Sequence, residues 1–282
     1  TLDATGTISF WITTAEDVGA DFVLLHVESG QATLVDLDIF GSAQVDSEDV
    51  SSQFVVDADA TLGFNYSFEY QIGDDINGEG SLVKEGDTLL DLLGVNTYTG
   101  GTQVLGGELR GHGEGIQGNI SVAKDAALTW KDDAISQFSY IGEITGEGRF
   151  TKDGTRTLRF VDGQGSVAVD QGIEILAGIL YGESTTITGD VAVAQDATLQ
   201  LYGATADPDF SGNISGAGQV EKIGLNDLRL SRANTFTGGL LVTAGRILGD
   251  ASSFPGNIEL DGSTTEVLFE QAEDGVHSGA IT

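Results

Sequence analysis

The sequence predicts an all-β fold, a parallel β-helix in which successive coils of one chain stack on each other. Three observations support this prediction. Motifs recur with a period of roughly 70 residues, as in repeat proteins. Apolar residues occur in short alternating runs, which are typical of strands, and the 41 glycines against only 2 prolines suit many tight turns. No stretch keeps a helical period of 3.6 for a dozen positions, so helices are not expected.

The longest repeated motif is Asn-Thr-aromatic-Thr-Gly-Gly, which begins once at Asn96 and again at Asn234. One aromatic exchange is the only difference within its six positions. Such recurrence indicates a chain built from repeats. The residues that define the two copies are Asn96, Thr97, Tyr98, Gly100 and Gly101, and Asn234, Thr235, Phe236, Gly238 and Gly239.

A second motif, lysine with glycine two positions later, occurs three times at intervals of about 70 residues. Another glycine follows each of these lysines after about 25 residues, and an Asn or Asp follows that glycine at a constant offset. Each unit of ~70 residues therefore divides into about three coils of roughly 18–26 residues, the length of a solenoid coil. The middle copy lacks the Asn-Thr-aromatic motif. The residues are Lys84, Gly86, Gly107 and Asn119; Lys152, Gly154, Gly178 and Asp190; and Lys222, Gly224, Gly245 and Asn257.

The chain divides into a less regular first part and a repeat-built second part. Residues 1–53 contain alternating or apolar runs at Thr7–Trp11, Phe22–Val27 and Ala32–Phe40, which are predicted strands. Residues 54–282 hold all the repeats. We therefore expect N-terminal β-helix coils over 1–53 that continue into the repeat-built β-helix of 54–282.

The net charge excludes several classes of partner. With 12 Lys and Arg against 44 Asp and Glu, the formal charge is −32. Such a chain is repelled by nucleic acid and by anionic membranes. The charge favours solubility, a basic partner, or bridging by divalent cations. The absence of cysteine suits a chain that passes unfolded through an oxidising compartment.

These motifs resemble the passenger-associated transport repeat of Gram-negative autotransporters, proteins of type V secretion. The likeness covers residues 78–130 and 209–270, is partial over 144–201 and is absent from 1–53. It implies a right-handed β-helix that crosses the outer membrane unfolded and folds outside the cell. It also implies a C-terminal membrane β-barrel in the full chain, absent from this sequence. Most characterised members of the family are adhesins in aggregation, biofilm growth or host attachment.

A polysaccharide-active hydrolase or lyase is the competing interpretation, because such enzymes share the β-helix. His112 lies between glycines, and Asp132 and Asp133 form an acidic pair. This set resembles the residues of pectin-cleaving hydrolases, but the motifs stand in a different order, and Tyr98 occupies the place of the nucleophile-activating aspartate. With 44 acidic residues, adjacent pairs are expected by chance. Catalysis is therefore the minority expectation.

No resident cofactor is expected, although loosely bound calcium is a weak alternative. Asp74, Asp75 and Asn77 hold part of a calcium-loop pattern, but Lys84 replaces its closing glutamate. Trp11, Trp130 and the alternating run Phe64, Tyr66, Phe68 and Tyr70 suggest either a sugar-binding stripe or a structural role, as a core face or as a cover over an edge of the β-helix. We favour the structural role, and we expect the four alternating aromatics to lie on one face of one strand.

The sequence thus predicts a cell-surface or secreted passenger fragment that acts without catalysis. We expect an adhesin or self-association module whose partners are copies of itself on neighbouring cells or a host or surface ligand. A passive stalk that presents another domain is a further alternative.

Overall fold

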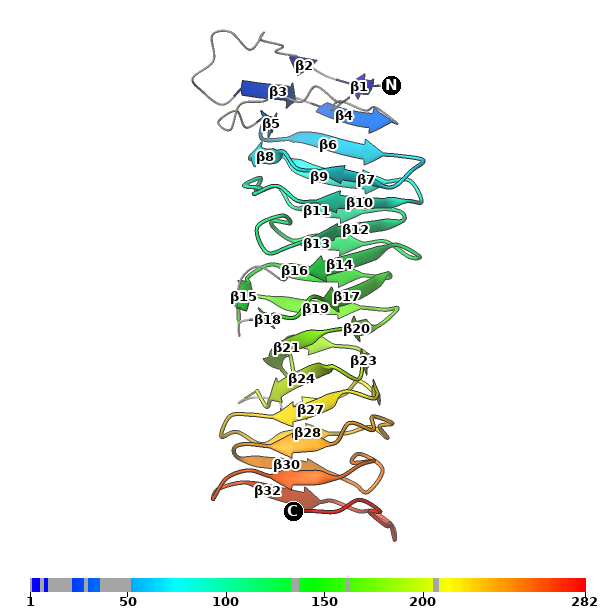
Figure 1. The fold of residues 1–282 in the computed structure, drawn as a ribbon, viewed down its shortest axis with the longest axis vertical. Helices are drawn as coiled ribbons and strands as arrows, with labels where there is room; N and C mark the ends of the chain where they lie inside the picture. Colours follow the sequence, from blue (N-terminus) through cyan, green and yellow to red (C-terminus); the bar gives the residue numbers. More distant parts are fainter. Residues whose placement is uncertain are drawn as a thin grey trace. The chain divides into compact units, whose positions relative to one another are not determined.

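The computed structural model describes residues 2–5, 8–9, 22–27, 30–35, 52–132, 137–160, 163–204 and 208–282. The chain divides into two compact units, Thr1–Thr129 and Trp130–Thr282, and each unit is a stack of short strands (Figure 1). The described residues contain strands and turns but no helix, and none of their segments forms a helix able to cross a membrane.

Unit 1 has three strands in the coils β5-β6-β7 and β8-β9-β10, and two strands in the following coils, β11-β12 and β13-β14. The strand orders within the unit are β2-β3-β5-β8, β1-β4-β6-β9-β11-β13 and β7-β10-β12. The strand bounds are β1 Leu2–Thr5, β2 Ile8–Ser9, β3 Phe22–Val27, β4 Gly30–Val35, β5 Ser52–Val56, β6 Ala60–Asn65, β7 Tyr70–Ile72, β8 Asp75–Gly78, β9 Ser81–Glu85, β10 Leu89–Leu92, β11 Thr102–Val104, β12 Glu108–Gly111, β13 Ile120–Val122 and β14 Ala127–Lys131, which spans the boundary between the units.

Unit 2 repeats this arrangement. Its strand orders are β16-β19-β22, β17-β20-β23-β26, β15-β18-β21-β24-β27-β29-β31 and β25-β28-β30-β32. The bounds are β15 Gln137–Tyr140, β16 Glu143–Gly146, β17 Arg149–Asp153, β18 Thr157–Phe160, β19 Ser166–Val169, β20 Ile173–Ile175, β21 Gly178–Glu183, β22 Ile187–Thr188, β23 Val191–Val193, β24 Ala197–Tyr202, β25 Asp209–Phe210, β26 Ile214–Gly216, β27 Gln219–Lys222, β28 Leu228–Leu230, β29 Leu240–Val242, β30 Arg246–Gly249, β31 Ile258–Leu260 and β32 Glu266–Phe269.

The strand registers confirm a parallel β-solenoid. In unit 1, Leu62 pairs with Leu82 and Leu82 with Thr102, so the chain advances by one coil between these partners. In unit 2, Leu158 pairs with Leu180 and Leu180 with Leu199 in the same way. The spacing of these partners agrees with the coil length expected from the sequence. Departures come from the first part of the chain, where β1 and β2 pair antiparallel with β4 and β3.

One repeat is three and a third coils long, slightly more than the three predicted. In unit 2, Lys152 lies on β17, and β20, β23 and β26 follow on the same face in the next three coils. Lys222 lies on β27, which directly follows β26 in the chain and belongs to the next face. Because a coil such as β16, β17 and β18 has three faces, the segment from Lys152 to Lys222 makes three coils and one face. Equivalent residues therefore move to a different face with each repeat.

The interior consists of columns of apolar side chains, as the alternation predicted. Trp130 is fully buried, in contact with the rings of Phe138 and Tyr140. The expectation of one strand face for the four alternating aromatics is wrong. The chain turns between β6 and β7, so Phe64 and Tyr66 are buried whereas Phe68 is 43% exposed. Trp11 lies outside the described residues.

Close packing at one corner explains the two glycines of the Asn-Thr-aromatic motif. A Cβ on Gly100 would lie 2.5 Å from the carbonyl carbon and oxygen of Gly80 in the preceding coil, and one on Gly238 would lie closer still to the oxygen of Gly218. The next residue in each copy is also glycine, with φ of +86° or +90°, a conformation that other residues adopt only with strain. The repeated glycines therefore allow the coils to approach each other at this corner.

Replacing Gly100 by alanine is expected to lower the free energy of unfolding by about 1–3 kcal/mol, because the new methyl group would clash with backbone atoms rather than with a movable side chain. Gly73→Ala is the matched control, since no atom lies within 4 Å of a Cβ built there. Urea denaturation of both variants measures the difference. Equal loss of stability in the two variants would contradict the close-approach explanation.

Candidate functional site

Each repeat contains a lysine whose ammonium group is enclosed by backbone carbonyls, an arrangement that we name the lysine clamp. Lys84 is fully buried, and its Nζ donates to the carbonyl oxygens of Glu85 at 2.6 Å, Gly86 at 2.9 Å and Gly106 at 3.0 Å. The first two carbonyls belong to the same corner, and the third belongs to the next coil. All three N–H donors of the ammonium therefore have an acceptor, which is the condition for burying a charge at acceptable cost.

The other two lysines form the same clamp. Lys152 Nζ donates to Asp153, Gly154 and Ala177 at 3.1, 2.7 and 3.0 Å. Lys222 Nζ donates to Ile223, Gly224 and Ala244 at 2.9, 2.6 and 2.8 Å, and both lysines are fully buried. The glycine two positions after each lysine has φ between +72° and +86°, which turns its carbonyl and that of its neighbour toward the ammonium. The Lys-x-Gly motif thus marks a lysine clamp in each repeat.

Burial lowers the pKa of the Lys84 ammonium to about 8, although the nearby Asp87 and Glu85 carboxylates act in the opposite direction. Burial also lowers the pKa of Lys222 to about 8, opposed by Asp227. At neutral pH both groups still carry their proton, so each retains the three donors that the clamp uses.

The asparagine of the Asn-Thr-aromatic motif joins three consecutive coils. Asn96 is buried; its Oδ1 accepts from the Ile76 amide at 2.7 Å and its Nδ2 donates to the Gly115 carbonyl at 2.5 Å. Asn234 makes the same two bonds, to Ile214 at 2.7 Å and Ser253 at 2.9 Å. The partners precede and follow the asparagine by 20 and 19 residues, one coil in each direction. The side-chain amide therefore takes the place of a peptide group in the ladder.

In the middle repeat, the position equivalent to this asparagine lies in a strand. Val167 of β19 pairs with Ile144 in the previous coil and Ile187 in the next, so its backbone makes the ladder that an asparagine side chain makes elsewhere. The motif's aromatic residue is buried in both full copies: Tyr98 is 1% exposed and Phe236 is 0% exposed. Tyr98 bonds to Thr102 Oγ1 at 2.7 Å, a contact that phenylalanine cannot make.

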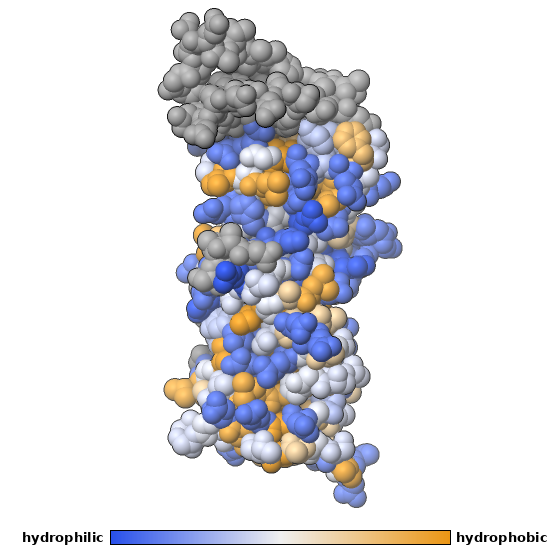
Figure 2. Space-filling view, in the orientation of Figure 1, coloured by the Kyte–Doolittle hydropathy of each residue, from blue (hydrophilic) through white to orange (hydrophobic). Residues whose placement is uncertain are grey.

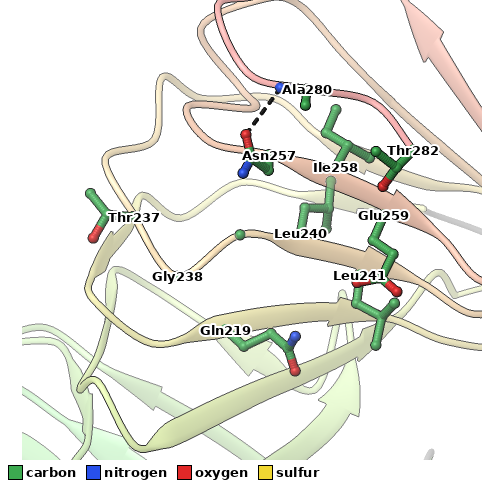
Figure 3. A pocket seen from close by; sticks show the side chains of 11 residues that line it. Gln219, Thr237, Gly238, Leu240, Leu241, Asn257, Ile258, Glu259, Ala280 and Thr282 are labelled. Atoms are coloured by element: carbon green, nitrogen blue, oxygen red, sulfur yellow. Dashed lines mark hydrogen bonds between the residues drawn. The ribbon is translucent and has the colours of Figure 1, made fainter.

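The corner glycines of the second full motif leave a hollow of about 290 Å³, shown in Figure 3. Leu240 and Ile258 line it, and Asn257 Oδ1 accepts a hydrogen bond from the Ala280 amide at 3.0 Å. The equivalent Asp190 Oδ1 accepts from the Asn213 amide at 2.9 Å. At Asp190 and Asn257, the constant offset from the glycine thus marks a side-chain oxygen that holds the following coil. The hollow contains no cluster of titratable groups.

Of the residues proposed for catalysis, His112 bonds within a turn and Asp132 is buried. His112 is half-buried; the Glu114 amide donates to its Nδ1 at 3.3 Å, and its Nε2 lies 3.1 Å from the Leu93 carbonyl. An Nδ1 that accepts a hydrogen bond leaves the proton on Nε2, so His112 stabilises its turn through both nitrogens. Asp132 is 4% exposed, and Asp133 lies outside the described residues. These assignments remain predictions.

Two of the three proposed calcium ligands, Asp75 and Asn77, already bond the next coil. Asp75 Oδ1 accepts from the Val95 amide at 2.7 Å, and Asn77 Oδ1 accepts from Thr97 Oγ1 at 2.5 Å. Burial, and then the neighbouring Asp75 charge, raises the pKa of Asp74 to about 6. In the part of the chain that the structure describes, no group of three or more His, Asp or Glu side chains is close enough to hold a metal ion. Loose calcium binding remains a prediction.

The structure is a repeat β-solenoid whose recurrent polar residues hold its coils together. A family model matches the repeat. Residues 82–110 and 220–248 match the passenger-associated-transport-repeat, so the chain carries two such repeats and is consistent with an autotransporter passenger domain. The partial middle copy is outside both matches. No curated protein and no solved structure matches the chain.

Lys84→Met is expected to lower the free energy of unfolding by about 2–4 kcal/mol, because it leaves the Glu85, Gly86 and Gly106 carbonyls without their donor. Lys124→Met is the control, since Lys124 is exposed. Chemical denaturation provides the comparison. Equal stability of the two variants would contradict this prediction, because water would then donate to the three carbonyls as effectively as the ammonium does.

The lowered pKa values predict a dependence of stability on pH. The folded pKa of Lys84 and Lys222 is about 8, and the ordinary pKa of lysine is 10.5. Between these values the unfolded chain binds more protons, so the contribution of both groups to stability rises as the pH rises from about 8 to 10. NMR titration of ¹³Cε-labelled lysine should show two resonances moving near pH 8. Lys84→Met and Lys222→Met should each remove one, and titration of both near pH 10.5 would contradict the prediction.

Proposed function

We propose that this chain is part of a cell-surface or secreted autotransporter passenger and acts without catalysis, as an adhesin or self-association module. One observation carries the proposal. The recurrent polar residues, which would be the first candidates for catalysis, are buried and form hydrogen bonds that join one coil to the next. Lys84, Lys222 and Asn96 each bond backbone atoms rather than facing a cleft.

The winding of the solenoid places equivalent repeat positions on different faces, so a ligand on one face does not contact all of them. Because a repeat is three and a third coils long, equivalent residues in unit 2 lie on different faces, as Lys152 and Lys222 do. A ligand lying along one face therefore does not meet the same repeat position in consecutive repeats. We infer that adhesive contacts depend on residues that vary between repeats and share a face.

The surface suits contact with partners over a broad area rather than a small-molecule pocket. Hydrophilic side chains cover much of the face seen in Figure 2, with hydrophobic residues between them. Leu93, Val95 and Leu105 are each about half exposed in unit 1, and Leu225 is 79% exposed in unit 2. The charge of −32 sets a long-range repulsion against any contact between copies.

Cells that display this chain are expected to clump or to adhere to a surface, and clumping should increase with NaCl up to about 0.5 M or with millimolar Ca²⁺, because salt shortens the range of the repulsion between acidic surfaces. Settling rate and microscopy measure the effect, with cells that display no passenger as the control.

Clumping that weakens as salt is added would contradict this account, because salt would then screen more attraction than the net repulsion between two chains that each carry a charge of −32. Displayed chain that neither clumps cells nor binds a surface would favour a passive stalk. Turnover of a polysaccharide that is lost in Asp132→Asn would restore the enzyme interpretation.

A further inference from the structure

One arginine on the outer face of unit 2 is not neutralised within the described part of the chain. Arg159 projects outward from β18, where the neighbouring Leu158 and Phe160 are buried. Its guanidinium lies over the Tyr181 ring at 4.3 Å from the centroid, and its Nη2 donates to the Tyr181 hydroxyl at 3.3 Å. Among the residues that the structure describes, no carboxylate lies within ion-pair distance of Arg159. Tyr181 thus holds an available positive charge in a fixed position.

The same place in the other repeats carries a charge that is already paired. The residue seven positions after each clamp lysine is Asp91, Arg159 or Arg229. Asp91 pairs with Arg110 at 2.7 Å, and Arg229 pairs with Asp209 at 2.9 Å and also with Glu270. Only in the middle repeat does this position carry a charge without an ion-pair partner among the described residues.

Arg159 belongs to a column of outward side chains, in which Ser139 of β15 precedes it. The strand registers place Arg159 beside Tyr181, Tyr181 beside Gln200, and Gln200 beside Glu221. All four are half-buried and alternate with interior residues. Gln200 Nε2 donates to Glu221 Oε2 at 2.7 Å, which orients the carboxylate. With strands about 4.8 Å apart, Arg159 and Glu221 lie about 14 Å apart along the column, which continues beyond Glu221 with Leu241 and Glu259.

The four-residue segment of this column from Arg159 to Glu221 is complementary to itself when reversed. If a second copy lies face to face with its solenoid axis running the opposite way, Arg159 of each copy faces Glu221 of the other, and Tyr181 faces Gln200. A twofold axis along the strands, midway between β21 and β24, produces this arrangement, and a twofold interface is the commonest form of self-association. Two copies running in the same direction would instead place arginine against arginine.

We propose that this outer face of unit 2, defined by Arg159, Tyr181, Gln200 and Glu221, is the contact through which a second copy of the chain binds in antiparallel orientation. The inference rests on the proposed self-association. Elsewhere the acidic surfaces repel each other, so the approach is favoured where a cation meets a carboxylate. Arginine and tyrosine are also among the residue types that most often dominate interface energies.

The test uses charge reversal and mixing. Purified chain is examined by sedimentation equilibrium at about 0.15 M NaCl, where surface charges are only partly screened, as wild type, as Arg159→Glu, as Glu221→Arg and as an equimolar mixture of the two variants. Each variant alone places like charges opposite each other twice, so its dimer should dissociate at least about tenfold more readily. In the mixture every facing pair is again opposite in sign, so the mixture should dimerise as wild type does.

Two controls separate this specific pairing from a change in net charge or in folding. Arg156→Glu and Glu147→Arg make the same charge changes at exposed positions outside the column, and they should leave dimerisation within about twofold of wild type. Urea midpoints of all variants show that the fold is kept. Should Arg159→Glu fail to fold, Tyr181→Ala with Arg159 intact gives an independent variant that removes the support of the guanidinium.

Dimerisation that is unchanged in both single variants, or two defective variants that fail to rescue each other, would overturn the proposed contact. A wild-type chain that stays monomeric at every concentration tested would overturn it as well. If cells displaying Arg159→Glu clump as wild type does, the adhesive function stands and this face is wrong. If cells displaying the wild type neither clump nor bind, the proposed function itself fails.

Discussion

Everything in this fold depends on satisfying backbone polar groups between coils. A coil cannot pair its own amides and carbonyls, so each coil relies on the coils before and after it. Strands meet this need along the faces, as the register from Leu62 to Leu82 and Thr102 illustrates. Where the strands are interrupted, the chain adds bonds from side chains: a lysine ammonium for three carbonyls, or an asparagine amide for one amide and one carbonyl.

The buried lysines and asparagines also link neighbouring coils in an acidic chain that has no cysteine to form disulfides. The chain has only 12 Lys and Arg residues, and three of them, Lys84, Lys152 and Lys222, are buried at equivalent places. A cation in the interior of an acidic solenoid lowers the local density of negative charge while it bonds neighbouring coils. In this chain, the residues that match the passenger-associated-transport-repeat supply recurring bonds between coils.

Much of the fold was predictable because its signal is local and periodic. The lysine spacing, the corner glycines and the alternating apolar residues indicated the coil length and the parallel β-solenoid. The role of the lysines was missed, although a cation recurring at Lys84, Lys152 and Lys222 in so acidic a chain was a usable signal. The turn between Phe64 and Tyr70 was also missed, because aromatic alternation continues through residues where the chain changes face. The outer column of Arg159 could not be predicted, since its members come from four coils and meet only through register.

The fractional length of the repeat has a consequence for how such a chain changes in evolution. In unit 2, excising one repeat unit would shorten the solenoid by three and a third coils and rotate everything beyond the cut by a third of a turn. Surface features that had shared a face would then point in different directions. Only the loss or gain of three repeats at once, ten whole coils, preserves their alignment. Growth or shrinkage by single repeats is therefore a way to rearrange the outer faces while the interior stays intact.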